Sequence, residues 1–287
     1  MIKKGIILSG GMGTRLSPLT KAVNKQLLPV YDKPLIFYPL SILMLANIKD
    51  ILIIVNKGQL SQYKKILPIN NNLGIKITYI EQPSPNGLPE AFILGNKFIG
   101  KNNVALILGD NFFYGQSFSN TLKSCTKLKS GAKVLLHKVN KPEKYGVAKV
   151  KKNKIIALKE KPKEFFSDLA VTGLYFFDNK VVKYAKSLKP SKRGELEIID
   201  LLNKYHRKKQ LKAEYLGRGG AWLDAGSIED FYKTSTFVSA VENRQGFKIA
   251  CLEEISLNKK WISKKQIRAS IKFYGNCEYS KYLNKLI

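Results

Sequence analysis

The 287-residue sequence has little cysteine and no long hydrophobic run. Its three cysteines, Cys125, Cys251 and Cys277, are odd in number and far apart, which excludes a readable disulfide framework or zinc motif. The longest apolar stretch, Leu35–Ile48, is interrupted by polar residues and falls short of the ~18 residues of a membrane span. The apolar run Ile6–Leu8 is too short for a signal peptide. We therefore expect a cytoplasmic protein.

Acidic residues and histidine are also scarce. The sequence has 21 Asp and Glu against 50 Lys and Arg, a net charge of +29, and only 2 His. Such an excess is typical of proteins that bind nucleic acid, anionic membranes or phosphorylated substrates. The basic residues are mostly lysines scattered along the whole chain, which favours a solvated lysine coat over a dedicated polyanion-binding surface. We expect no nucleic-acid partner and no membrane partner, although the segment after Phe247 does mix basic and aromatic residues.

Short apolar runs alternate with helical patterns through the first two thirds of the chain. This alternation predicts an α/β protein with a Rossmann-like, mostly parallel twisted sheet covered by helices on both faces. The predicted strands are Gly5–Ser9, Asp50–Val55, Lys76–Ile80, Val104–Leu108 and Val134–His137. The predicted helices are Pro34–Ala46, Gln59–Leu67, Leu88–Phe98 and Phe118–Leu128.

From about Tyr145 the pattern changes to shorter elements. A helix capped by Ser227 follows, and after Asn243 the chain becomes Lys-rich. The sequence therefore predicts a main domain, residues 1–243, and a small C-terminal subdomain of two or three helices, residues 244–287. The elements predicted in this part are strands Gly146–Val150, Lys154–Leu158 and Leu174–Phe177, and helices Val181–Ser187 and Leu196–Arg207.

Three glycines, Gly10, Gly11 and Gly13, follow the first predicted strand directly. The carboxyl ends of strands are where an α/β sheet binds its ligands, and glycines let backbone N–H groups approach phosphate oxygens closely. The loop fits neither the dinucleotide pattern nor the Walker pattern. An ordinary glycine turn is the alternative, but Arg15 and Lys25 nearby favour a triphosphate.

The segment Gly10–Leu16, followed by Lys25 and Gln26–Pro34, resembles the signature of the sugar-phosphate nucleotidylyltransferases. Further matching segments follow in chain order: Gln82–Leu88, Leu108–Asn111, Tyr145–Val147, Glu160–Pro162, Val171–Phe176, Arg193–Ile198 and Trp222–Asp224. The resemblance thus covers nearly the whole chain, and it is strongest to the thymidylyl-transferring branch.

The resemblance implies transfer of dTMP from dTTP to α-D-glucose 1-phosphate, with release of pyrophosphate, as the first step toward dTDP-rhamnose and other deoxysugar precursors. The attacking phosphate oxygen is already anionic, so no general base is needed and the scarcity of histidine fits. The resemblance also implies a nucleotide-binding part at about 1–140, a sugar-phosphate-binding part at about 141–226, and a homo-oligomer, frequently a tetramer.

Asp110 and Asp224 each follow an apolar segment. From the residues alone, each could equally cap a turn or a helix. The resemblance assigns both as ligands of Mg²⁺, which binds through one or two carboxylates together with substrate phosphates. Ala225 stands where the family commonly has a threonine, which removes one possible hydroxyl partner of Asp224 and predicts a changed metal affinity.

The remaining roles come from the same resemblance. Arg15 and Lys25 would hold the triphosphate, Gln82 would contact the edge of the base, and Gly87 would leave room for its ring. The catalytic set would be Arg15, Lys25, Asp110, Lys161 and Asp224. The nucleotide-binding set would be Leu8, Gly10, Gly11, Gly13, Thr14, Arg15, Lys25, Gln26, Gln82, Gly87 and Asp110. The sugar-phosphate-binding set would be Tyr145, Gly146, Glu160, Lys161, Val171, Thr172 and Arg193.

Two alternatives remain open. One is a related enzyme that transfers a uridylyl or cytidylyl group to a sugar 1-phosphate, although the segment Gln82–Gly87 favours the thymidylyl branch. The other is a sugar-nucleotide sensor that has lost catalysis. A sensor would lack a metal carboxylate or a triphosphate cation, and Asp110, Asp224, Arg15 and Lys25 are all present.

Overall fold

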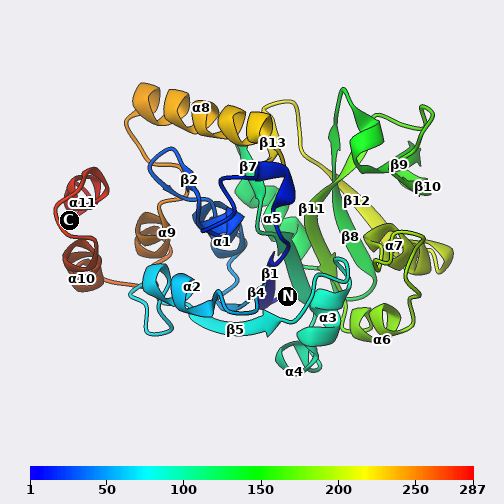
Figure 1. Cartoon of the computed structure of the whole chain (residues 1–287), viewed down its shortest axis with the longest axis horizontal. Coiled ribbons are helices and arrows are strands. Elements are labelled where there is room, and N and C mark those ends of the chain that lie inside the picture. The colour runs from blue at the N-terminus through cyan, green and yellow to red at the C-terminus, as the bar shows by residue number, and fades with distance from the viewer.

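The computed structural model describes residues 1–287, and a central sheet runs through the middle of the molecule (Figure 1). The strands are β1 (Lys4–Ser9), β2 (Pro29–Val30), β3 (Lys33–Pro34), β4 (Asp50–Asn56), β5 (Lys76–Gln82), β6 (Val104–Leu108), β7 (Asn111–Gly115), β8 (Ala132–Lys138), β9 (Gly146–Lys151), β10 (Lys154–Glu160), β11 (Leu169–Phe177), β12 (Leu211–Tyr215) and β13 (Gly220–Asp224). The α-helices are α1 (Phe37–Leu45), α2 (Leu60–Ile66), α3 (Glu90–Leu94), α4 (Asn96–Ile99), α5 (Phe118–Thr126), α6 (Val181–Lys186), α7 (Ile198–Arg207), α8 (Ile228–Gln245), α9 (Leu252–Asn258), α10 (Lys264–Tyr274) and α11 (Glu278–Asn284). Three short 3₁₀ helices are η1 (Thr14–Leu16), η2 (Lys25–Leu27) and η3 (Pro142–Lys144).

The main sheet has nine strands. Its main path runs β10-β9-β11-β6-β1-β4-β5, with β8 beside β11 and β12 beside β8. Strands β6, β1, β4 and β5 are parallel, whereas β11 pairs antiparallel with β6, β8 and β9. The prediction of an α/β fold with a mostly parallel central sheet is confirmed, and the antiparallel strands that follow residue 145 extend it.

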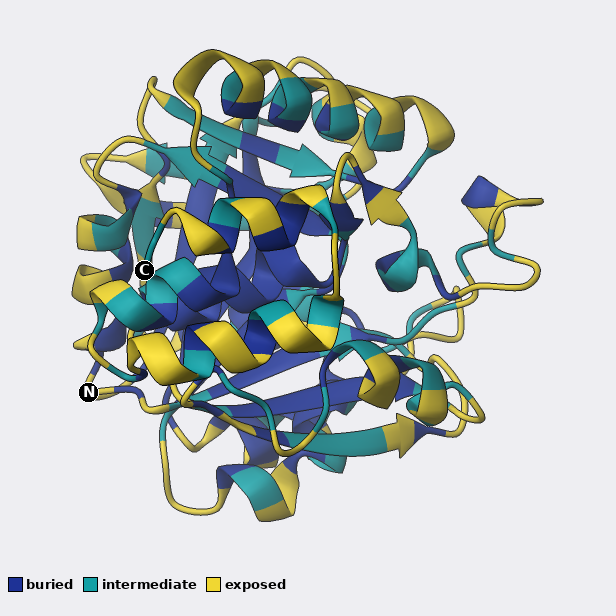
Figure 2. Cartoon of the chain, turned by 90° about the vertical axis from the view of Figure 1, so that its left-hand side faces the viewer, coloured by how far each residue is buried: buried dark blue, intermediate teal, exposed yellow.

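Alternate residues of the central strands pack into two separate cores, one on each face of the sheet. Ile7 and Ile53 belong to the core under α1, α2 and α5, whereas Ile6 and Leu52 belong to the core under α3, α4, α6 and α7. Side chains that alternate between faces need both faces covered when every position is apolar. Figure 2 shows the resulting buried interior under helices that are exposed only on their outer sides.

Several element boundaries differ from the prediction, and three of the differences have a clear physical reason. The helix predicted at Leu88–Phe98 is two short helices, which meet at Gly95, where a Cβ would lie 2.9 Å from the carbonyl oxygen of Ala91. The first predicted helix begins at Phe37 because Pro34 pairs with Pro29 in the β2–β3 ribbon. Strand β11 begins at Leu169, earlier than predicted, because its first residues pair with β8.

The C-terminal helices divide their packing between two cores. Helix α9 packs on α1 and buries Leu252 in the main core, whereas α10 and α11 close over a separate cluster that includes Ile267 and Leu283. They form the left end of the molecule in Figure 1 and face the viewer in Figure 2. The prediction of two or three helices after Asn243 is met by three. None of the helices combines the length and apolar composition that crossing a bilayer requires.

Candidate active site

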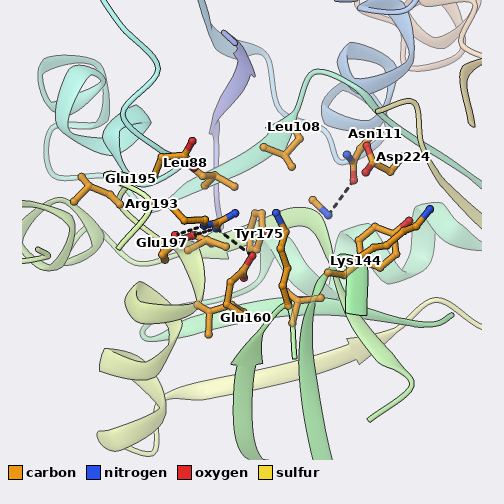
Figure 3. Close-up of a pocket in the computed structure, with 18 of the residues that line it drawn as sticks. Leu88, Leu108, Asn111, Lys144, Glu160, Tyr175, Arg193, Glu195, Glu197 and Asp224 are labelled. Carbon is orange, nitrogen blue, oxygen red and sulfur yellow. Dashed lines mark hydrogen bonds and ion pairs between the residues drawn. The ribbon is translucent and has the colours of Figure 1, made fainter. Parts of the chain in front are cut away.

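A cavity of about 320 Å³ opens beside the carboxyl end of β6, between β11, the β9–β10 hairpin, β13 and the segment before α7 (Figure 3). Eight residues of the sequence-predicted site line it: Arg15, Tyr145, Gly146, Glu160, Lys161, Val171, Arg193 and Asp224. They come from six separate segments of the chain, so only the fold brings them together.

The two predicted metal-binding aspartates meet through a short ribbon. Asp110 lies between β6 and β7, and β13 pairs antiparallel with β7 so that Asp224 stands opposite Asn111. The Ala225 N–H donates to the carbonyl oxygen of Asp110 over 3.0 Å. Figure 3 shows Asn111 and Asp224 side by side on one wall of the cavity. The fold therefore places both carboxyl-bearing residues at the same corner.

Their electrostatic environments differ. Burial would raise the pKa of Asp110, but the Lys25 ammonium bonded to it, with help from Asn111, lowers that pKa below its ordinary value. Burial, and then the charge of Asp110, raise the pKa of Asp224 to about 7, while Lys25 and Arg15 offset part of the effect. Like charges held together in a buried site favour a cation between them.

The donor set fits Mg²⁺. The two aspartates supply hard oxygen ligands, and no cluster of three or more His, Cys, Asp or Glu side chains exists to form an all-protein cage. Magnesium typically takes one or two carboxylates and completes its shell with substrate phosphate and water. Ala225 is fully buried in an apolar cluster with Phe112 and Val238, so its side chain packs away from solvent in the interior.

Asn111 holds Asp110 in place, a role that the sequence alone does not indicate. The Asn111 Oδ1 atom accepts hydrogen bonds from Trp222 Nε1 over 2.6 Å and from the Gly173 N–H over 3.0 Å. Because two donors fix Oδ1, the Nδ2 atom must face the carboxylate, and it donates to Asp110 Oδ1 over 3.1 Å. Asn111 and Trp222 both line the cavity. In the sequence, only their position could have indicated this role, because Asn111 and Trp222 each lie within two residues of a predicted metal ligand.

The opposite wall interleaves cations with carboxylates. The Arg193 guanidinium bonds Glu197 through Nη2 at 2.7 Å and Nε at 3.1 Å, and its Nη2 lies 3.6 Å from Glu160. Burial, and then Glu197, raise the pKa of Glu160, which Lys161 and Arg193 partly offset. Figure 3 shows this group of ion pairs. A phosphate could bind to Arg193 and Lys161 here, and hydroxyl groups could donate hydrogen bonds to the carboxylates. Glu197 is a second residue that sequence reasoning missed.

Other predicted site residues do not line this cavity, and only some of them contact residues at its edge. Leu8 pairs with the cavity residue Leu108, and Lys25 bonds Asp110. The glycine loop is fixed by Asn56, which was not predicted: it accepts from the Gly11 N–H at 2.9 Å and donates to the Gly11 carbonyl at 2.8 Å. The nucleotide-binding residues outside the cavity lining are Leu8, Gly10, Gly11, Gly13, Thr14, Lys25, Gln26, Gln82, Gly87 and Asp110.

Gln26 and Thr172 are both buried, in different ways. The Gln26 Oε1 atom has no hydrogen-bond partner although the residue is 2% exposed, which leaves an acceptor beside the predicted nucleotide site. Thr172 Oγ1 donates to the carbonyl of Leu135 on β8 over 3.1 Å, so its hydroxyl is committed to the sheet, while the neighbouring Val171 lines the cavity.

Gly87 has a structural reason to be glycine. Its φ is +102°, and its backbone bridges to Leu196, whose carbonyl oxygen would lie 2.2 Å from a Cβ at position 87. Any side chain would break this bridge. Because Leu196 lines the cavity, the bridge joins the loop after β5 to the cavity wall before α7.

Residues 4–241 match the nucleotidyl transferase family, a range that includes the glycine loop and both aspartates. The chain belongs to this family. Among curated nucleotidyl transferases it is 50% identical over 285 residues to the glucose-1-phosphate thymidylyltransferase of Neisseria meningitidis serogroup A, covering 99% of both chains. It is 46% identical to the enzyme of that name from Xanthomonas campestris pv. campestris, covering 99% of this chain and 97% of the other.

Solved structures give the same picture. A Bacillus anthracis protein described as a glucose-1-phosphate thymidylyltransferase, in complex with sucrose, superposes with a TM-score of 0.76 at 41% identity, covering 82% of this chain and 94% of that one. A UDP-glucose pyrophosphorylase with UDP-glucose superposes with a TM-score of 0.73 at 28% identity, covering 85% and 100%. The chain is therefore a nucleotidyltransferase that resembles sugar-phosphate enzymes over nearly its full length.

Proposed function

We propose that this nucleotidyltransferase transfers dTMP from dTTP to α-D-glucose 1-phosphate with Mg²⁺ and releases pyrophosphate. The observation that carries the proposal is the pairing of β13 with β7, which brings Asp224 beside Asp110 at the edge of a cavity lined on its other side by Lys161 and Arg193. Two anionic reactants could meet at that corner. The name shared by the full-length relatives supports the choice of substrates.

On the nucleotide side, backbone N–H groups of the glycine loop would bind phosphate oxygens, and Arg15 and Lys25 would offset the charge of the leaving pyrophosphate. Arg15 lies within reach of the metal corner, since a Cβ on Gly226 would be 3.1 Å from both Arg15 Nη2 and Asp224 Oδ1. Gln82, at the end of β5, would contact the edge of the base.

On the sugar side, Lys161 and Arg193 would bind the phosphate of glucose 1-phosphate, and Glu160 would accept hydrogen bonds from sugar hydroxyls. Gly146, Val171 and Thr172 would contact the pyranose partly through their backbones. Glu197 would hold the Arg193 guanidinium in a bidentate pair that fixes its direction.

The reaction would be an in-line displacement at the α-phosphorus by an oxygen of the sugar phosphate. The nucleophile needs no base, so the protein contributes alignment and fixed positive charge. When bound, Mg²⁺ would neutralise charge on the phosphates. The chain's own residues would hold the reactants through cations on both walls and through Asp110, which Asn111 supports. The rings of Trp222 and Tyr145, with centroids 5.0 Å apart, form the wall beside them.

The proposal extends to the setting of the enzyme. It would act in the cytoplasm, where nucleoside triphosphates are made, and supply dTDP-glucose for dTDP-rhamnose and other deoxysugars. Residues 1–140 would form the nucleotide-binding part, 141–226 the sugar-phosphate-binding part, and 244–287 the C-terminal helical subdomain. By family resemblance the active form would be a homo-oligomer, a tetramer.

The second candidate is uridylyl transfer, which the likeness to a UDP-glucose pyrophosphorylase supports. Pyrophosphate release from a panel of nucleoside triphosphates and hexose 1-phosphates separates the two. We expect the highest kcat/KM with dTTP and glucose 1-phosphate. A preference for UTP would replace the thymidylyl proposal with the uridylyl one, and no turnover on any pair would leave the non-catalytic sensor.

A further inference from the structure

Glu90, the first residue of α3, accepts three hydrogen bonds from two residues that precede it in the chain. Its Oε2 atom accepts from the side-chain Nε2 of Gln82 and from the Asn86 N–H at 3.2 Å, and its Oε1 accepts from Asn86 Nδ2 at 2.7 Å. Figure 1 shows β5, which ends in Gln82, running toward α3. Glu90 thus ties the end of β5 to the loop that follows it.

A carboxylate next to a glutamine decides which way the amide points. An amide can be turned over so that its oxygen and nitrogen exchange places, and only its partners distinguish the two states. Glu90 offers only acceptors, so an oxygen of Gln82 facing it would set two acceptors together. The Nε2 atom of Gln82 must therefore face Glu90, and its Oε1 must face the opposite way.

The Oε1 atom of Gln82 faces the glycine loop. A Cβ on Gly10 would lie 2.2 Å from it, so this close approach is possible only with glycine. No N–H or O–H group of the chain donates a hydrogen bond to this oxygen. Gln82 thus presents an acceptor, and no donor, toward the loop that would hold the nucleotide.

We propose that Glu90 is a positioning residue that sets base specificity, because it forces Gln82 to offer only a carbonyl oxygen to the base. Thymine and uracil carry an N3–H that can donate to this oxygen, whereas cytosine carries an unprotonated N3 that would face it acceptor to acceptor. A buried acceptor left unpaired by the wrong base costs binding. This inference rests on the proposed function, since it assigns the base that the same site selects.

The test compares kcat/KM for dTTP and for dCTP in the full-length enzyme and its variants. We expect Glu90→Ala to free the amide and lower the dTTP/dCTP ratio about tenfold or more, by losing a fixed hydrogen bond to the base. Glu90→Gln keeps a carbonyl acceptor for Gln82 Nε2, so it should retain most of the ratio. Glu90→Lys replaces the acceptor with a donor, should turn the amide over, and should lower the ratio furthest.

The matched control is Glu81→Ala, on the same strand as Gln82. Glu81 accepts a hydrogen bond from the Gly58 N–H at 2.7 Å and does not contact the side-chain amide of Gln82. It should leave the ratio unchanged. A purely structural role of Glu90 would lower kcat/KM for both nucleotides equally, and an unchanged ratio in Glu90→Ala and Glu90→Lys would overturn the inference. Circular dichroism checks that each variant is folded, and Glu90→Lys tests the inference if Glu90→Ala is not. A wild-type enzyme inactive with dTTP would instead overturn the proposed function.

Discussion

At the scale of single residues, the position of Asp110 depends on side chains that do not themselves bind a metal. Lys25 contacts one of its oxygens and Asn111 the other, and Trp222 and Gly173 in turn fix Asn111. Supporting hydrogen bonds of this kind commonly change metal affinity or activity by about 10- to 100-fold when removed. We therefore expect an uncharged residue, Trp222, to affect the affinity of the proposed metal site.

Trp222→Phe removes the indole N–H and leaves the Gly173 N–H as the one donor to Asn111 Oδ1. We expect kcat to fall about tenfold and Mn²⁺ binding to the nucleotide-free protein, measured by isothermal titration calorimetry, to weaken by a similar factor. Trp261→Phe, at the second tryptophan of the chain, is the matched control and should change neither. Unaltered Mn²⁺ affinity in Trp222→Phe would show that the indole only fills space.

The sequence predicts more of this site's members than of its hydrogen bonds. The resemblance assigns roles to Asp110, Asp224 and Arg193, and all three lie at or beside the cavity. It does not give the partners of Asn111, because those contacts join β7, β11 and β13, and no local pattern reveals which strands will be neighbours. Glu197 is different: it lies four residues after Arg193, and that spacing was a local signal for the pair. A hydrogen bond across the fold depends on register, which only the folded chain fixes.

At the scale of elements, four charges tie the β2–β3 ribbon to the end of α8. Lys33, 2% exposed, pairs with Asp32 and with Glu242 at 2.8 Å, and Lys248 also contacts Asp32. Glu242 accepts from the Ile249 N–H over 2.8 Å as well. Every charge here has a partner, which is the condition under which buried ions are tolerated.

This cluster predicts how stability depends on pH. Burial alone would raise the pKa of Asp32, but Lys33 and Lys248 bring it below its ordinary value of 3.8. A lowered pKa in the folded state means that ionised Asp32 stabilises the fold above pH 3.8 and that this contribution is lost as the pH falls through the folded-state pKa. Denaturant unfolding of Asp32→Asn should therefore show a smaller loss of stability on acidification than wild type. Parallel curves for the two proteins would contradict the assignment.

Removing one charge of the cluster should cost more than removing an exposed one. Lys33→Met leaves Glu242 with Lys248 as its one cation, at the longer distance of 3.4 Å, and we expect a loss of about 3–5 kcal/mol in the free energy of unfolding. Lys281→Met is the control, because its pair with Glu278 is exposed to solvent and should contribute little to stability. Equal effects of the two substitutions, measured by urea unfolding, would refute the burial argument.

Many of the elements were predictable, but strands β2, β3, β7, β12 and β13 were not, although β7 and β13 bring Asp110 and Asp224 together. Apolar strands and helical periodicity located β1, β4, β5, β6 and the Ser227-capped helix α8, whose cap accepts from the Asp230 N–H. The break at Gly95 was not predictable from periodicity, because the apolar pattern continues through it while the backbone packs tightly there. The local sequence pattern therefore predicts where these helices and strands lie. It does not predict the break at Gly95, which depends on a close contact in the folded chain.

At the scale of the whole molecule, the chain carries a net charge of +29, and both substrates of the proposed reaction are anions. Long-range attraction raises association rates and is screened when added salt shortens the Debye length from about 30 Å at 0.01 M to about 8 Å at 0.15 M. We expect kcat/KM for glucose 1-phosphate to fall about tenfold over that range, with kcat at saturation nearly constant. Initial rates of pyrophosphate release at several KCl concentrations give both kcat/KM and kcat. A kcat/KM that does not change with salt would show that the lysines do not steer the substrate.

The central claim is that Asp110 and Asp224 act together on one Mg²⁺ between two anionic reactants. Pyrophosphate release from dTTP and glucose 1-phosphate, with Mg²⁺ and then with a chelator, tests it most directly in wild type, Asp110→Asn and Asp224→Asn. The account predicts that wild type needs Mg²⁺ for turnover and that the chelator abolishes it. It also predicts that kcat falls about a hundredfold or more in each folded variant. Turnover that survives the chelator, or a folded variant as active as wild type, would contradict it.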